Sequence, residues 1–282
     1  MNYRHAYHAG NFADVMKHAL VARILAHLLK KETPFRVLDT HAGIGLYDLE
    51  AEEAGKTREW QGGIGLLESP LAMPAAETLI APYRAAIAAV RERFGPMAYP
   101  GSPMLLWAML RRDDRAIVVE RHPVDSETLA ELFARDRRIK PLALDGWTAL
   151  HAMIPPKERR GLVLVDPPYE ATGELERLGE ELARAWRKWP TGIFVGWYPI
   201  KDAAPIQHFA DALAARGLRK VLRLELLVDA TDDPARLNGS GLVVINPPWT
   251  LKEEAEVLLP ALAERLGRNG RGGFRSAWIA PE

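Results

Sequence analysis

The sequence predicts an α/β fold built around a mostly parallel β-sheet. Short apolar runs alternate with helical stretches along most of the chain, which is the arrangement expected of βαβ units with buried strands. The first run ends in a glycine-containing loop, residues 39–45 (DTHAGIG), and a later run ends in the tetrad at residues 166–169 (DPPY). Both loops are expected at the carboxyl edge of the sheet, where open α/β folds bind their ligands.

Five apolar runs are the expected parallel strands, at residues 35–39, 116–120, 140–146, 161–169 and 191–199. Residues 221–228 and 241–249 are joined by a turn-rich loop, so a hairpin-like pair is predicted there. A last short strand is expected near the end of the chain, at residues 276–280 (SAWIA).

Helical patterns fill the intervals between the strands, and one interval is unusually long. The first helix is expected directly after Asn11, a residue type that suits a helix N-cap. Between Gly45 and Tyr99 lie 53 residues, which carry helical patterns at residues 62–71 and 75–94. We therefore predict one main domain, residues 1–46 and 99–282, with a helical insertion at residues 47–98. A further helix is expected at residues 252–266.

Composition excludes several classes of protein. Of the 282 residues, 48% are hydrophobic and 26% charged, which is typical of a globular chain and not of a disordered one. The chain has no cysteine, which excludes disulfides, thiol nucleophiles and cysteine-bound metals. No apolar run reaches the length of a membrane span, and the N-terminus lacks the apolar segment of a secretory signal. These features predict a cytoplasmic protein.

The tetrad Asp166-Pro167-Pro168-Tyr169 is the strongest chemical signal in the sequence. The exocyclic amine of a nucleobase is a poor nucleophile, because its lone pair is delocalised into the ring. The Asp166 carboxylate and the Pro167 carbonyl can both accept its N–H bonds and turn the lone pair toward an electrophile. Two prolines stiffen the turn, and Tyr169 offers a flat face for an extruded base. The alternative is a rigid turn after a strand, capped by an aspartate.

Three further segments carry candidate ligands for a cofactor. The loop at residues 39–45 permits close backbone approach and lacks both the G-x-G-x-x-G pattern and the lysine of a P-loop. Glu120 ends the next strand, where a carboxylate can bind ribose hydroxyls or cap a helix. Asp145 and Gly146 can bind an adenine amine. Ser102 suits a helix N-cap followed by proline at the first helical position, or a helix N-terminus that faces a cofactor carboxylate.

The order of these parts predicts the cofactor. An acid–glycine loop, an acid, an acid–glycine pair and then D-P-P-Y follow successive strands. This combination suits S-adenosylmethionine, which has no phosphate group for a loop to bind.

Two other features of the sequence are expected to lie outside the site. The similar motif Asn246-Pro247-Pro248-Trp249 ends an antiparallel strand at the opposite edge, so we predict a structural turn. The histidines show no H-E-x-x-H pattern, so no metal site is predicted.

Positive charge is concentrated near the N-terminus, although the whole chain balances 37 Lys and Arg against 37 Asp and Glu. The first 31 residues hold four of the eight histidines and a single acid, Asp14. Tyr3 and Tyr7 in this tail suit contacts with unstacked bases as well as they suit a frayed terminus. Residues 265–275 (RLGRNGRGGFR) contain four arginines and no acid, which fits a phosphate contact or, more simply, a solvated loop.

With these residues assembled, the chain closely resembles the bacterial 23S ribosomal RNA adenine-N6 methyltransferase family of the RlmJ type, over essentially its full length. The resemblance rests on motifs spread along the chain. They are Tyr3-Arg4-His5, residues 8–11 (HAGN), Asp14, Lys17-His18, residues 38–43 (LDTHAG), 100–103 (PGSP), 166–169 (DPPY), 197–199 (WYP), 246–249 (NPPW) and Trp278-Ile279.

The resemblance implies a Rossmann-like class I S-adenosylmethionine-dependent methyltransferase fold, with a mostly parallel seven-stranded sheet, a small inserted helical subdomain and an N-terminal tail, residues 1–12, over the site. It implies methyl transfer to N6 of one adenine in 23S rRNA, with S-adenosylhomocysteine as product. The implied catalytic group is Asp166, Pro167 and Tyr169, with Asp166 as the acid/base residue. Implied cofactor contacts are His18, His41, Ser102, Glu120, Asp145, Gly146 and Asp166. Implied RNA contacts are Tyr3, His5, Lys17 and Tyr169.

The expected partner is 23S rRNA, and we expect a monomer without a membrane association or an obligate protein partner. Two alternatives stay open. The first is a DNA adenine-N6 or protein-glutamine methyltransferase, since both classes use the same kind of tetrad. The second is a non-catalytic RNA-binding factor on a degenerate methyltransferase fold, although the intact set of acids argues against it.

Overall fold

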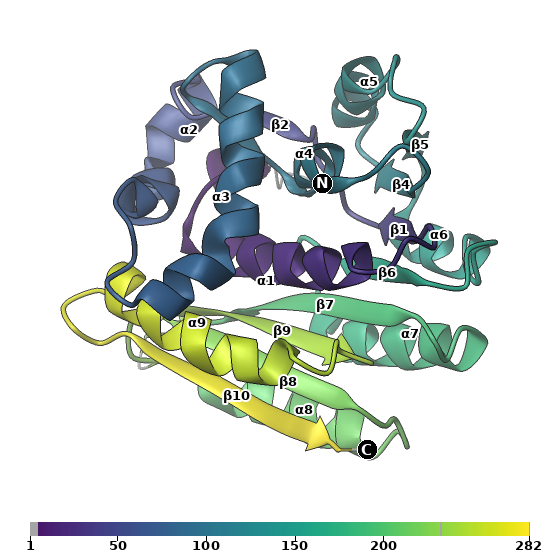
Figure 1. The fold of residues 1–282 in the computed structure, drawn as a ribbon. Coiled ribbons are helices and arrows are strands. Elements are labelled where there is room, and N and C mark those ends of the chain that lie inside the picture. The colour runs from purple at the N-terminus through teal and green to yellow at the C-terminus, as the bar shows by residue number, and fades with distance from the viewer. Residues whose placement is uncertain (1–4, 232, 282) are drawn as a thin grey trace.

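A computed structural model describes residues 5–231 and 233–281 and shows helices packed on both faces of one large sheet (Figure 1). The strand order is β10-β8-β9-β7-β6-β1-β4-β5. The strands are β1 (Arg36–Asp39), β4 (Arg115–Glu120), β5 (Ile139–Ala143), β6 (Gly161–Val165), β7 (Ile193–Ile200), β8 (Val221–Leu227), β9 (Gly239–Ile245) and β10 (Gly273–Ala280).

Strand directions confirm the mostly parallel sheet and the hairpin-like pair. Strands β5, β4, β1, β6 and β7 are parallel neighbours, whereas β9 is antiparallel to both β7 and β8. The sheet has eight strands, one more than the predicted seven, because β10 pairs with β8 along seven registered positions. The predicted short terminal strand is therefore a full edge strand.

Helices cover the two faces of the sheet and bury two separate hydrophobic clusters. One cluster joins the sheet to α1 (Phe12–Leu29), α4 (Ser102–Met109), α5 (Pro123–Leu132) and α9 (Leu251–Leu266). The other joins it to α6 (Gly146–Ala152), α7 (Glu174–Lys188) and α8 (Ala203–Ala214). In β1, Val37 belongs to the first cluster and Leu38 to the second, because successive side chains of a strand point to opposite faces.

Helix α1 begins where the sequence predicts. The Asn11 side chain accepts hydrogen bonds from the backbone N–H groups of Ala13 and Asp14, at 2.9 and 3.0 Å. Such a cap satisfies N–H groups that have no partner within the helix. The helix is buried around nearly its whole circumference, including the polar residues Asp14, Lys17 and His18. It lies between the sheet and α3 (Pro74–Phe94), so its first turns are held in place on both sides.

Residues 47–98 contain helical elements, together with one strand pair at their ends. They include α2 (Glu52–Thr57), the 3-10 segments η2 (Glu59–Gly62) and η3 (Ile64–Leu67), and α3. Strands β2 (Leu46–Asp48) and β3 (Ala98–Pro100) pair antiparallel where this segment leaves and rejoins the main chain. Helix α3 packs on α1 and α9 within the first hydrophobic cluster. The division into a main domain and an insertion stays a prediction.

The Asn246-Pro247-Pro248-Trp249 motif forms the predicted turn. Ile245, at the end of β9, pairs with the start of β7, so the motif lies at the edge of the sheet opposite to the carboxyl ends of the parallel strands. The Asn246 backbone is left-handed (φ 54°), and its side-chain amide donates to the carbonyls of Pro190 and Gly192 at 2.7 and 2.8 Å. In the described part of the chain, no helix is both long and apolar enough to span a bilayer.

Candidate active site

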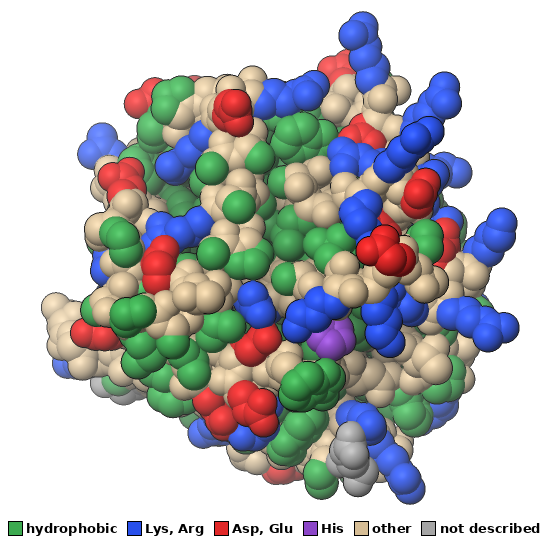
Figure 2. Space-filling model, in the orientation of Figure 1, with side chains coloured by type: hydrophobic (Ala, Val, Ile, Leu, Met, Phe, Trp, Pro, Cys, Tyr) green, Lys and Arg blue, Asp and Glu red, His purple; other side chains and the backbone are tan. Residues whose placement is uncertain are grey.

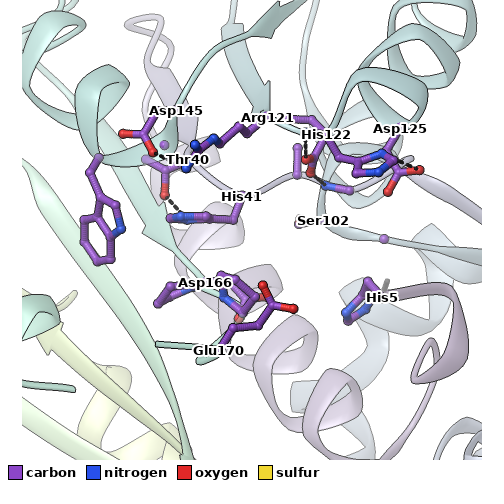
Figure 3. A pocket seen from close by; sticks show the side chains of 18 of the residues that line it. His5, Thr40, His41, Ser102, Arg121, His122, Asp125, Asp145, Asp166 and Glu170 are labelled. Carbon is purple, nitrogen blue, oxygen red and sulfur yellow. Dashed lines mark hydrogen bonds and ion pairs between the residues drawn. The ribbon is translucent and has the colours of Figure 1, made fainter. Parts of the chain in front are cut away.

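The candidate site lies where the strand order reverses direction. Strand β1 has β4 on one side and β6 on the other, so the loops after β1 and β6 diverge at this point. A cavity of about 640 Å³ opens there, a size typical of small-molecule sites. All seven residues implied as cofactor contacts line it, namely His18, His41, Ser102, Glu120, Asp145, Gly146 and Asp166. In Figure 3, Asp166 lies across this cavity from His41 and Asp145.

The glycine loop and Glu120 hold each other in position. Gly43 has a left-handed backbone (φ 60°), and a Cβ atom there would lie 2.4 Å from the Tyr47 hydroxyl, so only glycine fits. Its N–H donates to Glu120 Oε2 at 2.9 Å, and the His122 N–H donates to Glu120 Oε1 at 2.7 Å. The Glu120 carboxylate is thereby fixed at the carboxyl end of β4, and its remaining lone pairs are available to a ligand.

Asp145 caps α6, a role not predicted from the sequence, and its implied contact with the cofactor adenine stays a prediction. Its Oδ1 accepts from the Thr148 N–H at 2.9 Å and caps α6, while Oδ2 lies 3.6 Å from Arg121. Burial pushes the Asp145 pKa upward, but the Thr148 bonds and the nearby arginines outweigh burial and leave the pKa below its ordinary value. A Cβ at Gly146 would lie 2.2 Å from the Thr40 carbonyl oxygen, so glycine is required where α6 approaches the loop after β1.

Two histidines of the cavity are neutral in the folded protein. Burial lowers the pKa of His18 to about 3 and the pKa of His41 to about 4. His18 Nδ1 and the Tyr99 hydroxyl are 3.1 Å apart, and His41 Nδ1 lies 2.8 Å from the Thr40 hydroxyl. Both rings therefore present neutral nitrogens, which suit hydrogen bonds to a ligand.

The predicted N-cap at Ser102 is wrong by one residue. Gly101 is the N-cap of α4, and Ser102 is the first helical residue, without a capping side chain on either. The Ser102 side chain instead lies beside the carboxyl of Asp39, the buried acid at the end of β1. Burial raises the pKa of Asp39 to about 7, although the nearby Ser102 hydroxyl works in the opposite direction. A glycine cap needs only extended backbone, which Gly101 adopts.

Asp166 belongs to a buried chain of charges. Lys17 Nζ lies 2.6 Å from Asp166 Oδ2 and 2.8 Å from Asp14 Oδ1, and the Lys17 side chain is only 4% exposed. Asp14 Oδ2 accepts from His5 at 3.0 Å and from the Gly10 N–H at 2.9 Å. Burial alone would lower the Lys17 pKa, but the two carboxylates raise it above its ordinary value. The structure thus pairs Lys17 with Asp166 at the boundary of the cavity, and its implied contact with RNA stays a prediction.

Tyr169 lines a second cavity, of about 700 Å³, that adjoins the first. Its backbone is left-handed (φ 53°), and its hydroxyl donates to the Trp197 carbonyl at 2.7 Å. The two aromatic rings meet edge to face with centroids 5.5 Å apart. Pro167 lines the first cavity, whereas His5, Lys17, Asp166 and Pro168 line both.

Several site residues were not predicted from the sequence. Trp147 lines the first cavity, edge-on to His41 at 5.5 Å, and the Arg177 guanidinium lies 4.7 Å from the Trp147 ring centroid. Trp147 directly follows Gly146, which was predicted to lie in the site, so its place in the sequence could have indicated a site residue. Asp14 could also have been found from the sequence, as the single acid in a basic segment. The contact of Trp197 with Tyr169 joins distant segments and has no local signal.

The two tail and loop predictions have separate outcomes. Tyr3 lies outside the described residues. In the arginine-rich loop, Arg265 donates to the Leu66 carbonyl and the Ser69 hydroxyl at 2.9 and 2.7 Å. These two hydrogen bonds link the end of α9 to η3 and to the residues that follow it. Arg268 is exposed and lines the second cavity.

Within residues 5–231 and 233–281, no group of three or more potential ligands is arranged to hold a metal ion. The expectation that the protein binds no metal stays a prediction.

The strand order and the fold define the class of Rossmann-like methyltransferases. Residues 32–280 match the family described as "Ribosomal RNA large subunit methyltransferase D, RlmJ", and the chain belongs to this family. Proteins named ribosomal RNA large subunit methyltransferase J from Haemophilus influenzae and Escherichia coli are each 38% identical to it, over the full length of both chains.

A crystal structure of a Legionella pneumophila protein has a similar fold. It superposes with a TM-score of 0.84 at 31% sequence identity, and the match covers 96% of this chain and 98% of that one. The mostly parallel α/β fold predicted from the strand pattern and the Rossmann-like class implied by the resemblance are therefore confirmed.

Proposed function

We propose that this protein transfers a methyl group from S-adenosylmethionine to N6 of a specific adenine in 23S ribosomal RNA. The observation that carries the proposal is the position of Asp166, which lines both adjoining cavities. One cavity then holds the methyl donor and the other the target base, with the tetrad between them. Membership of a ribosomal RNA large subunit methyltransferase family supports the same reaction.

The first cavity has a donor set that fits S-adenosylmethionine. Glu120 and Asp145 lie at the carboxyl ends of the neighbouring parallel strands β4 and β5. There the Glu120 carboxylate suits a ribose, and the Asp145 carboxylate suits an adenine amine. The neutral rings of His18 and His41 and the hydroxyl of Ser102 complete a lining without a phosphate-binding lysine loop. When bound there, S-adenosylmethionine supplies an electrophilic methyl group on a sulfonium sulfur.

The tetrad orients the target amine. Asp166 Oδ and the Pro167 carbonyl accept the two N–H bonds of the adenine N6, which aims the nitrogen lone pair toward the first cavity. Tyr169 and Trp197 form an aromatic wall in the second cavity against which the extruded base can lie. Most of the rate enhancement then comes from holding the amine in line with the methyl group.

The buried charges exclude Lys17 as the group that takes the amine proton. Lys17 stays protonated, since Asp14 and Asp166 on either side raise its pKa, so it cannot serve as a base. The proton of the methylated amine passes to the Asp166 carboxylate or to water. Lys17 acts on the reaction through Asp166, whose carboxylate it fixes at 2.6 Å.

We further propose that the protein works in the cytoplasm on ribosomal RNA, as a monomer and without an obligate protein partner. The names of its relatives support an RNA substrate. The choice of substrate separates this function from the alternatives with the same tetrad, a DNA adenine or protein-glutamine methyltransferase.

The deciding experiment is a methyl-transfer assay with tritiated S-adenosylmethionine. The substrates are unmodified 23S rRNA, DNA and total protein, offered separately, and labelled RNA is digested to nucleosides. We expect label in N6-methyladenosine from RNA alone. Label in DNA or in protein, and not in RNA, would show that the proposed substrate is wrong and that the labelled one takes its place. If calorimetry detected no binding of S-adenosylmethionine, the protein would be a non-catalytic binding factor.

A further inference from the structure

We propose that four exposed cations around the second cavity form a binding site for the backbone phosphates of single-stranded RNA on either side of the target adenosine. The four are Arg58, Lys201, Arg236 and Arg268, which we name the basic rim. The inference rests on the proposed function and adds the surface that receives the substrate.

The basic rim is assembled from four separate parts of the chain. Arg58 ends α2, Lys201 directly follows β7, Arg236 lies between β8 and β9, and Arg268 follows α9. All four side chains are exposed and line the same cavity. Local sequence pattern explains none of this convergence, since the four positions lie more than thirty residues apart from one another along the chain.

The acids of the second cavity are already engaged elsewhere. Asp14 and Asp166 hold Lys17 between them. Glu59 accepts from His8 and from the Asn11 side chain, both at 3.0 Å. In contrast, no rim cation forms an ion pair with a carboxylate of residues 5–231 or 233–281; Arg268 lies over the Phe12 ring at 5.7 Å. The rim cations are thus without a direct ion pair to these acids, although the Arg268 charge contributes to lowering the pKa of Glu59.

The two cavities have opposite charge character. The first is lined by six Asp and Glu and three Lys and Arg, and the second by three Asp and Glu and five Lys and Arg. The proposed methyl donor carries positive sulfonium and ammonium groups and suits the acidic cavity, whereas a polyanion suits the basic one. On the face drawn in Figure 2, acidic and basic side chains are interspersed, so the difference in charge belongs to the two cavities and not to the surface as a whole.

The arrangement fits an extruded base better than a protein side chain. Stacking on Tyr169 and Trp197 would bring the base into the cavity, and the backbone would then pass over its mouth, where the rim lies. Each phosphate neutralised by a lysine or arginine releases condensed counterions, so binding through the rim must depend on salt. A glutamine side chain offers no charge for four cations to bind.

The test compares two quadruple variants with equal formal charge. The rim variant carries Arg58→Gln, Lys201→Gln, Arg236→Gln and Arg268→Gln. The control variant removes four exposed arginines that precede β4, β5, β7 and β8 at the opposite edge of the sheet, by Arg112→Gln, Arg137→Gln, Arg187→Gln and Arg219→Gln. Thermal melts check that both variants fold, and calorimetry with S-adenosylmethionine checks the first cavity.

The readouts are filter binding of an unmodified 23S rRNA transcript over a range of salt, and the kinetics of methyl transfer to it. For the rim variant we expect the slope of log K against log salt to fall by roughly 3, since each single-strand phosphate contact contributes about 0.7. We also expect the RNA KM to rise about tenfold or more, with kcat within about twofold of wild type. The control variant should match the wild type.

The outcomes separate the inference from the proposed function. A rim variant with the slope and KM of the control overturns the basic rim, while RNA methylation by the wild type still supports the function. A wild type that labels only DNA or only protein overturns the RNA site together with the proposed substrate. A loss confined to the rim variant, with cofactor binding intact, supports both.

Discussion

At the scale of single residues, Asp166 has the most demanding position in the molecule. It directly follows β6, lines both cavities and forms an ion pair with Lys17, which lies 149 residues earlier in the chain. The position at the strand end could be predicted from the tetrad. The partner could not, because no local pattern links Lys17 to Asp166; only the packing of α1 against the sheet brings them together.

Replacement of Asp166 should stop the reaction without unfolding the protein. In Asp166→Ala, the amine loses one acceptor and its orientation, so we expect single-turnover methyl transfer to fall at least about a hundredfold. Lys17 keeps its bond to Asp14, which limits the cost of the buried charge. Asp166→Asn, which retains an acceptor oxygen, should be less impaired. An Ala variant within about tenfold of wild type would contradict the assigned role.

Glu120 should affect the cofactor and not the RNA. Glu120→Ala leaves the N–H groups of Gly43 and His122 without their acceptor and removes the carboxylate proposed for the ribose. We expect the Kd for S-adenosylmethionine to rise about tenfold or more in calorimetry, with RNA affinity unchanged. The control is Glu131→Ala, an exposed carboxylate on α5. Weaker RNA binding with normal cofactor binding would refute the ribose role.

At the scale of elements, α1 supplies much of the site from its first two turns. Asp14, Lys17 and His18 all lie there, so the way the helix begins sets their positions. The sequence predicts this start correctly because an asparagine before an apolar helical pattern is a strong local signal. It places the α4 cap one residue late, since Gly101 and Ser102 are both acceptable cap residues and only backbone geometry separates them.

The α1 cap can be tested against a matched cap elsewhere. Asn11→Ala should lower the free energy of unfolding by about 1 kcal/mol through loss of two backbone bonds. Asp202→Ala, which removes the cap of α8, should cost a similar amount. Only the Asn11 variant should also slow methyl transfer, because α1 carries Lys17. Urea denaturation and single-turnover rates report the two effects; equal rates in the two variants would count against positioning by α1.

Other elements show where a local pattern is insufficient. Residues 62–71 were expected to form a helix, but they form short 3-10 turns, as glycines at 62, 63 and 65 interrupt them. Strand β10 is longer than its apolar core suggests, because its pairing with β8 recruits Gly273, Phe274 and Arg275. Such pairing depends on a partner strand distant in sequence, which no single segment encodes.

At the scale of the whole molecule, net charge conceals how the charge is used. The chain is neutral, yet its two cavities differ in sign, and its buried groups titrate at unusual values. His18 and His41 are neutral in the fold, whereas Asp39 holds its proton well above the range of an ordinary aspartate. His18 and His41 line the proposed cofactor site and Asp39 lies beside His41 in the loop after β1, so the fold and the site share one dependence on pH.

Stability should fall as the pH is lowered from about 6.5 to 4.5. In this window the unfolded chain protonates both histidines, from a model-peptide pKa of 6.5, while the folded protein does not, with values of about 3 and 4. Asp39 opposes them, because its folded pKa of about 7 lets the native state keep a proton that the unfolded chain releases above 3.8. For these three groups together the net difference is one proton, or about 1.4 kcal/mol per pH unit.

Removal of the Asp39 proton site should make this dependence steeper. In Asp39→Asn the opposing contribution disappears, so the loss of unfolding free energy should approach about 2.8 kcal/mol per pH unit over the same window. Urea denaturation of both proteins at half-unit intervals between pH 4.5 and 6.5 measures the two slopes. The lowered pKa of His27 acts in the same direction in both proteins and leaves their difference intact. Equal slopes would show that Asp39 is ionised in the fold, and a wild-type stability that rises as the pH is lowered would show that the two histidines titrate freely.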